Sequence, residues 1–201
     1  PGSGVDLSLY SRKLAPDGPS VIMFAARLLV DKGVREFVHA AKLVRRSKFH
    51  TRFVVVGVVD PLNPASIEQS ELDHWKKTGV VELWGYRDDM EQVLSLATIV
   101  VFPSYREGLP KVLIEAAACG RAVITTDVPG CRDAIEDGIT GLLVPVRCAS
   151  AISDTIISLL ENSDRCKKMG DAGRKLAEEK FDVRQVIAKH MKIYRDLLKA
   201  S

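Results

Sequence analysis

Residues 98–126 read TIVVFPSYREGLPKVLIEAAACGRAVITT, and this stretch decides the fold class. The runs 99–102 and 122–125 are apolar without alternation, which is typical of strands buried on both faces of a sheet. The segment 110–119 between them predicts a helix with a proline in its first turn and Gly120 after its last residue. A strand, a helix and a second strand in this order predict a parallel pair joined by a crossover helix.

The same alternation runs through most of the chain. Strands are expected over 21–26, 53–56, 80–83, 99–102, 122–125 and 142–144. Helices are expected over 34–46, 61–75, 89–97, 110–119, 150–161, 164–180 and 182–199. The sequence therefore predicts an α/β fold, with a Rossmann-like parallel six-stranded sheet, helices on both faces and a helical C-terminal tail.

The composition is that of an ordinary globular domain. Hydrophobic residues make up 46% and charged residues 27% of the 201 residues, and 29 Lys and Arg against 26 Asp and Glu give a net charge of +3. This balance argues against a dedicated nucleic-acid binder, and no apolar run reaches the length of a membrane-spanning helix. The cysteines are too far apart for a zinc knuckle and the histidines form no metal-binding pair. We therefore expect reduced, intracellular thiols and no metal.

The two ends of the chain are expected to differ from the sheet region. Residues 1–19 read as irregular chain, and residues 182–201 predict a C-terminal helix with an apolar stripe. Two alternatives are left open for the surface on which this stripe packs: this domain, or a part of the protein outside the chain. His190 falls within the stripe and is expected to be a packed or rim histidine without chemistry.

In an open parallel sheet, ligands bind in the crevice at the carboxyl ends of the strands. Arg27 and Lys32 follow the first expected strand and precede a helix N-terminus, which suits an anion. Arginine can fork onto two phosphate oxygens while lysine acts as a point charge, a combination suited to a diphosphate. The alternative is a solvated loop in which Arg27 or Lys32 pairs with Asp31.

A second anion-binding element is expected at the start of the helix over 110–119. With Pro110 as the first helical residue, the backbone N–H groups of Lys111, Val112 and Leu113 are free to bind a ligand. A cation in a first helical turn opposes the helix dipole, and a bound phosphate would offset that cost.

Two glutamates flank this helix start. Glu107 lies in the loop before the helix, and Glu115 lies one turn inside it. Their carboxylates can accept hydrogen bonds from hydroxyls on either side of a diphosphate, as a nucleotide sugar presents them. The alternative is a surface pair between Lys111 and Glu115.

The segments AARLLVDKG, FPSYREGLPKVLIEAAACGRAVITTDVPG and DGITGLLVP resemble the C-terminal half of glycosyltransferase family 4, whose enzymes have the two-domain GT-B fold. The resemblance spans nearly the whole chain. It implies that Arg27 and Lys32 contact the donor diphosphate. It also implies that Glu115 binds the ribose hydroxyls and that Glu107 binds the donor sugar.

Further donor contacts are implied by the resemblance. The backbone that lines the sugar and the phosphates belongs to Gly108, Leu109, Pro110, Lys111 and Val112. The backbone near Gly85, Tyr86 and Arg87 borders the nucleobase. The stretch GVVDPLNP departs from the glycine-rich pair of many relatives, so no role is expected for Gly57.

The resemblance also implies a function. Residues 1–201 are expected to form the nucleotide-sugar-binding domain of a retaining glycosyltransferase, with 1–19 as inter-domain segment and the N-terminal acceptor-binding domain absent. The full enzyme would move a hexosyl or N-acetylhexosaminyl unit from a nucleoside diphosphate sugar, with UDP favoured, to a glycan or lipid-linked acceptor. The pathway would be bacterial surface polysaccharide or lipopolysaccharide biosynthesis. Its catalytic residues would be Arg27, Lys32 and Glu107, with no metal, no cofactor and no nucleic-acid partner.

The chain alone is expected to bind nucleotide without turnover. The full enzyme is expected in the cytoplasm, with peripheral association at the inner face of the membrane. A nucleotide-sugar epimerase or a glycan phosphorylase of the same architecture is an alternative, against which the spacing of Glu107 and Glu115 argues. A non-catalytic nucleotide-binding or assembly module is the other. A dinucleotide-dependent dehydrogenase is disfavoured because no GxGxxG motif follows the first strand.

Overall fold

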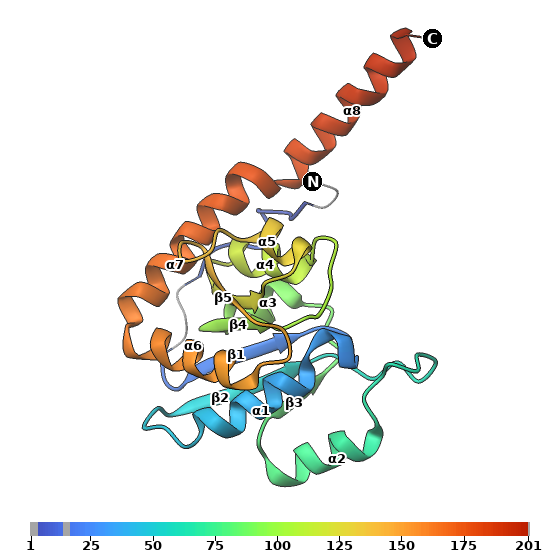
Figure 1. Cartoon of the computed structure of the whole chain (residues 1–201). Helices are drawn as coiled ribbons and strands as arrows, with labels where there is room; N and C mark the ends of the chain where they lie inside the picture. Colours follow the sequence, from blue (N-terminus) through green and yellow to red (C-terminus); the bar gives the residue numbers. More distant parts are fainter. Residues whose placement is uncertain (1–3, 14–16, 201) are drawn as a thin grey trace.

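The structure is a computed structural model that describes residues 4–13 and 17–200, with side chains as far as residue 198. Its centre is a six-stranded parallel sheet in the order β3-β2-β1-β4-β5-β6 (Figure 1). The strands are β1 (Ser20–Ala25), β2 (Thr51–Val56), β3 (Glu82–Gly85), β4 (Ile99–Phe102), β5 (Ala122–Thr126) and β6 (Gly141–Val144). The strand order reverses between β1 and β4, so their carboxyl ends form the edge at which this class of sheet binds ligands.

Helices cover both faces of the sheet, as predicted. They are η1 (Val30–Lys32), α1 (Val34–Val44), α2 (Gln69–Thr78), α3 (Met90–Ser95), α4 (Lys111–Ala118), α5 (Pro129–Ala134), α6 (Ala149–Glu161), α7 (Ser163–Leu176), η2 (Ala177–Phe181) and α8 (Val183–Ala200). α1 and α6 pack together on one face, and α3, α4 and α7 pack together on the other (Figure 1).

Three details of the predicted pattern are wrong. The helix predicted over 61–75 begins only at Gln69, because prolines hold the preceding loop out of helical geometry. The strand predicted over 80–83 lies two residues later, at β3. The short helix α5 was not predicted, because its six residues are too few to show an apolar period.

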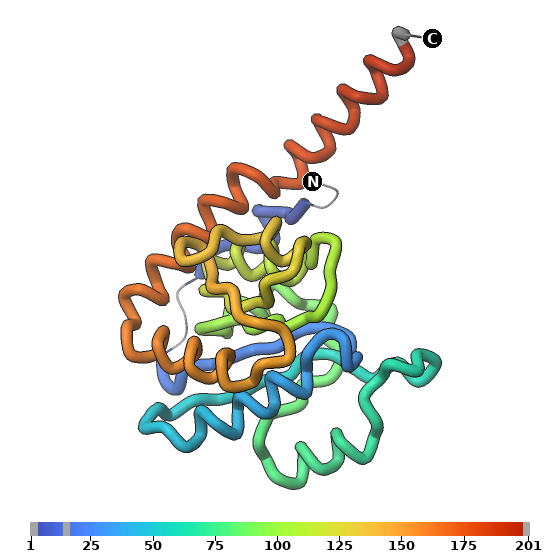
Figure 2. Tube along the Cα trace, in the orientation of Figure 1, coloured from blue at the N-terminus to red at the C-terminus, as the bar shows by residue number. Residues whose placement is uncertain are grey.

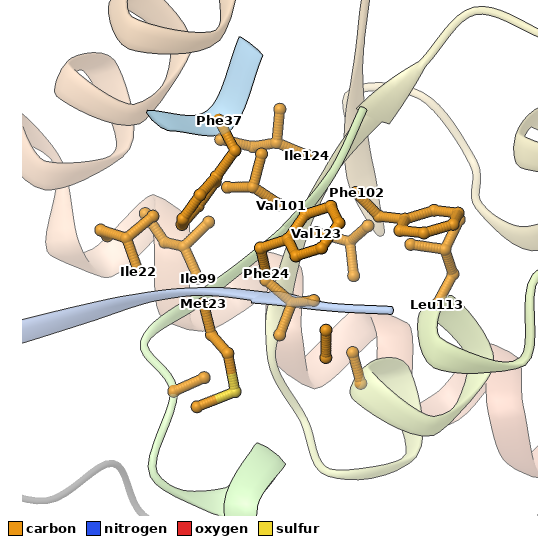
Figure 3. Close-up of a cluster of buried hydrophobic side chains, with 14 of the residues drawn as sticks. Ile22, Met23, Phe24, Phe37, Ile99, Val101, Phe102, Leu113, Val123 and Ile124 are labelled. Carbon is orange, nitrogen blue, oxygen red and sulfur yellow. The ribbon is translucent and has the colours of Figure 1, made fainter. Parts of the chain in front are cut away.

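Side chains from both faces of the sheet form one core, part of which Figure 3 shows. Phe24 of β1 packs between Phe37 of α1 and Phe102 of β4, with ring centroids 5.7 Å and 6.3 Å apart. Phe37 also packs edge-on against Phe53 of β2, with centroids 5.6 Å apart. These buried aromatic contacts add directional packing to the hydrophobic burial. They fix the strands whose carboxyl ends meet at the reversal of strand order.

The last helix leaves the domain. α7 continues into the π-helical turn η2, and α8 then projects away from the sheet (Figures 1 and 2). Val186 in its first turns is buried, whereas the large apolar side chains beyond it are at least 45% exposed: Ile187, Met191, Ile193, Tyr194, Leu197 and Leu198. Of the two partners left open for the stripe, this domain therefore covers its start at Val186, while most of the stripe is exposed, and His190 is exposed as well. None of the described helices, α8 included, has both the length and the apolarity to cross a membrane.

The N-terminal segment runs against the C-terminal helices. The Val5 N–H donates to the Phe181 carbonyl at 2.8 Å, and the Val183 N–H donates to the Val5 carbonyl at 3.0 Å. Arg174 of α7 donates to the Tyr10 carbonyl at 2.7 Å. Within the segment expected over 1–19, residues 1–3 and 14–16 lie outside the described residues.

Candidate functional site

A crevice of about 260 Å³ opens at the carboxyl edge of the sheet. Its walls come from the ends of β1, β2 and β3 and from the first turns of α3 and α4. Five residues predicted to bind a donor line it: Arg27, Tyr86, Arg87, Val112 and Glu115. The structure thus brings together residues that lie far apart in the sequence.

Gly57 also lines this crevice, although no role was expected for it. It follows β2 with a φ of 138°, and a Cβ there would overlap the carbonyl oxygen of Ala26. Its N–H donates to the Gly85 carbonyl at 2.8 Å. Glycine is required because three strand ends approach one another closely here. The signal that could have found it is a glycine directly after a predicted strand.

Arg27 and Lys32 lie on this edge with different partners. Arg27 Nη1 lies 3.4 Å from Asp60 Oδ2, and the arginine side chain is 64% exposed. Lys32 Nζ donates to Glu107 Oε1 at 2.6 Å, and these two side chains are only 19% and 14% exposed. Within the described residues, Asp31 forms an ion pair with neither cation, so the alternative of a loop neutralised by Asp31 is wrong.

The loop that carries Glu107 is held from two sides by glycines. Gly33, with a φ of 76°, lies so close to the loop that a Cβ would overlap the Pro103 carbonyl oxygen. A Cβ at Gly130 in α5 would overlap the Gly108 carbonyl oxygen. The backbone around Glu107 is therefore fixed by contacts that only residues without a side chain permit.

Helix α4 begins one residue later than predicted. Pro110 is the N-cap, with φ −72° and ψ 117°, so its extended backbone places Lys111 first in the helix. The Leu113 N–H donates to the Pro110 carbonyl at 3.1 Å and is therefore not available to a ligand, contrary to the prediction. The N–H groups of Lys111 and Val112 belong to the first turn of α4, where backbone N–H groups have no acceptor within the helix.

Glu115 is a half-buried carboxylate on the crevice side of α4. Burial raises its pKa, while the positive charge of Lys111 and a hydrogen bond from the Tyr10 hydroxyl act in the opposite direction. Burial, with the negative charge of Glu115, also raises the pKa of Tyr10. The described residues contain no ion pair between Lys111 and Glu115, which removes the predicted surface-pair alternative. Sequence reasoning did not find Tyr10.

Of the remaining predicted donor residues, Tyr86 and Arg87 line the crevice, whereas Gly108 and Leu109 are not among its lining residues. The Tyr86 side chain is 74% exposed. Arg87 donates to both carboxylate oxygens of Asp89, at 2.7 Å and 2.5 Å, which fixes its guanidinium beside the crevice. Gly108 is exposed and Leu109 is half-buried, in the loop that joins Glu107 to α4. The part of the chain that the structure describes contains no group of three His, Cys, Asp or Glu residues able to hold a metal ion.

Comparison with known proteins identifies relatives of this chain. The family model of Glycosyl transferases group 1 matches residues 19–162. The chain is 31% identical over 193 residues to N,N'-diacetylbacillosaminyl-diphospho-undecaprenol alpha-1,3-N-acetylgalactosaminyltransferase of Campylobacter jejuni, with 95% of this chain and 48% of that protein covered. It is 30% identical over 181 residues to the capsular polysaccharide biosynthesis glycosyltransferase CapM of Staphylococcus aureus, with 90% and 47% covered. The chain thus spans about half the length of these relatives.

The fold has neighbours among solved structures. HepE of Anabaena, in complex with UDP-glucose, superimposes with a TM-score of 0.79 at 22% identity, covering 94% of this chain and 56% of that chain. At that identity the likeness establishes the fold. The family model covers most of the chain and includes every residue predicted for the site. This chain therefore belongs to the family of glycosyl transferases group 1.

Proposed function

We propose that this chain is the donor-binding half of a retaining glycosyltransferase. One observation carries the proposal: cations and carboxylates of suitable kinds meet at the carboxyl edge of the sheet. Arg27 and Glu115 line one crevice, and Lys32 of η1 pairs with Glu107 of the loop between β4 and α4. Such a set can bind a diphosphate and, beside it, the hydroxyls of a ribose and a sugar.

In this proposal, catalysis is mainly electrostatic. As the sugar–phosphate bond breaks, negative charge grows on the diphosphate. Arg27, Lys32 and the N–H groups at the start of α4 would stabilise that charge in a fixed geometry. Glu107 would accept a hydrogen bond from a sugar hydroxyl and orient the anomeric carbon. We assign no side chain as nucleophile, and retention of configuration rests on the family resemblance.

The substrates are proposed from the relatives. HepE is described with UDP-glucose, which favours UDP as the nucleotide. The name of the Campylobacter relative specifies N-acetylgalactosaminyl transfer to a diphospho-undecaprenol-linked sugar, and that of CapM specifies capsular polysaccharide biosynthesis. We therefore propose transfer of a hexosyl or N-acetylhexosaminyl unit to a glycan or lipid-linked acceptor.

The acceptor site would lie in the other half of the full protein. The apolar stripe of α8 would pack on that half, because most of its large apolar side chains are at least 45% exposed on this domain. Peripheral association of the full enzyme with the inner face of the membrane, and the absence of a metal requirement, stay predictions.

Titration calorimetry with UDP, GDP and ADP tests the proposal. We expect UDP to bind most tightly, and Lys32→Ala and Glu115→Ala each to weaken its binding about tenfold, the effect of losing one charge-assisted hydrogen bond. Lys167→Ala is the control, since this exposed lysine lines a different cavity, which shares no lining residue with the crevice. Absence of nucleotide binding by the folded chain would refute the proposal and favour an assembly module.

A further inference from the structure

Ser104 is a buried serine whose hydroxyl contacts the carboxylate of Glu107. It follows β4 by two positions and is 0% exposed. Its Oγ lies 2.7 Å from Glu107 Oε1, 3.0 Å from the Asp31 carbonyl oxygen and 3.3 Å from the Arg106 carbonyl oxygen. All three neighbours are acceptors, and a serine hydroxyl has one proton to donate. The shortest contact is to the carboxylate, where the bond is charge-assisted, so the proton is donated to Glu107.

The position of Ser104 is itself fixed. The Thr126 hydroxyl donates to the Ser104 carbonyl from β5, and Thr126 is fully buried. Next to it on β5, the buried Thr125 hydroxyl donates to the Phe102 carbonyl at 2.7 Å. Two threonines of one strand therefore anchor the backbone on both sides of Pro103. A hydroxyl on such an anchored backbone can fix the carboxylate that it contacts.

Both donors to Glu107 act on the same oxygen. Lys32 Nζ donates to Oε1 at 2.6 Å, and Ser104 Oγ donates to Oε1 at 2.7 Å. The described residues place no hydrogen bond on Oε2. A carboxylate held by one oxygen presents the other in a defined direction, ready to accept a hydrogen bond from a ligand.

We propose that Ser104 is a positioning residue that orients Glu107 toward a hydroxyl of the donor sugar. The inference rests on the proposed function. Lys32 would have two tasks there, since it is also proposed to bind the diphosphate. When Lys32 turns toward the phosphate, the Ser104 hydroxyl keeps Oε1 in place, and Oε2 remains directed at the sugar. Ser104 thus contributes to recognition of the sugar and not of the nucleotide.

The test compares sugar binding with nucleotide binding in Ser104→Ala. The probes are UDP, UDP-glucose and UDP-N-acetylgalactosamine, titrated into the chain by calorimetry. For the nucleotide sugar that binds wild type most tightly, we expect about tenfold weaker binding, with UDP binding unchanged. Ser153→Ala is the matched control, because Ser153 is also buried but its hydroxyl donates to a backbone carbonyl, that of Ser150, at 2.8 Å.

A double-mutant cycle separates positioning from packing. In the Glu107→Ala background, Ser104→Ala should change nucleotide-sugar binding less than twofold, because the side chain that it orients is gone. Equal weakening of UDP and nucleotide-sugar binding in Ser104→Ala would overturn the inference, as would no effect on either. A wild type that binds no nucleotide sugar more tightly than UDP would also overturn it. A wild type that binds none of the three probes would refute the proposed function instead.

Discussion

Replacing Lys32 with methionine should destabilise the protein in the absence of ligand, because the carboxylate of Glu107 loses its cationic partner. Methionine preserves the unbranched shape of the side chain but removes the ammonium group 2.6 Å from Glu107 Oε1. The carboxylate then remains largely buried without its cation. Ser104 still donates to it at 2.7 Å, so part of its stabilisation survives.

The magnitude follows from the burial of the pair. Removing one partner of a fully buried ion pair costs about 3–5 kcal/mol of unfolding free energy. The two side chains are 19% and 14% exposed. With that exposure and the remaining hydroxyl donor, we expect roughly half, about 2 kcal/mol. For a chain of this length that corresponds to a fall in Tm of about 4–8 °C, which circular dichroism or scanning calorimetry measures directly.

A second variant distinguishes a stranded charge from a loss of packing. Lys32→Met/Glu107→Gln leaves no uncompensated charge, so most of the lost Tm should return, while nucleotide binding stays weak. Lys111→Met is the control, because Lys111 is exposed on the first turn of α4, and we expect its Tm to match wild type. The reasoning is refuted if Lys32→Met has the same Tm as wild type, or if the Tm of the double variant is as low as that of Lys32→Met.

Three further predictions concern stability. Burial raises the pKa of Glu115, so the folded chain binds this proton more tightly than the unfolded chain, and stability falls as pH rises from the unfolded to the folded pKa. The urea midpoint of Glu115→Gln should therefore rise relative to that of wild type as the pH increases above the ordinary pKa of a glutamate, and a difference that is constant with pH would contradict this. In urea denaturation, Gly130→Ala should lower the free energy of unfolding by about 1–3 kcal/mol through overpacking, whereas Gly108→Ala, with open space at its Cβ, should not. Tyr194→Ser should leave Tm unchanged, because this side chain is 60% exposed, whereas Val186→Ser, at 7% exposure, should lower it.

The sequence patterns predicted most of the fold because strands buried on both faces leave continuous apolar runs. β1, β2, β4, β5 and β6 all lie on such runs, within two residues of the predicted bounds. β3 was misplaced because Val80 and Val81 are buried before the ladder starts at Glu82, so hydrophobicity marked burial and not pairing. The direction of α8 could not be predicted, since an apolar stripe specifies that a helix packs but not on what.

The site was predictable where it depends on position along the chain. Arg27 follows a strand and Glu115 follows a helix start, and both positions are visible in sequence. Their partners were not, because Asp60 and Tyr10 reach them from other segments of the chain. The need for glycine at position 57 depends on the approach of neighbouring strands, which one-dimensional spacing cannot express.

The pairing of the cations decides how a diphosphate could enter this site. Arg27 and Asp60 form an exposed pair at 3.4 Å, and such pairs contribute about 0–1 kcal/mol, so a phosphate can displace the carboxylate at little cost. Lys32 and Glu107 are far more buried, and separating them completely would leave a stranded carboxylate. A diphosphate would therefore replace Asp60 as the partner of Arg27, whereas Lys32 would bind the diphosphate while it remains paired with Glu107. Lys32 would then contact the diphosphate and Glu107 at the same time. In that position it could couple the departure of the diphosphate to the orientation of the sugar by Glu107.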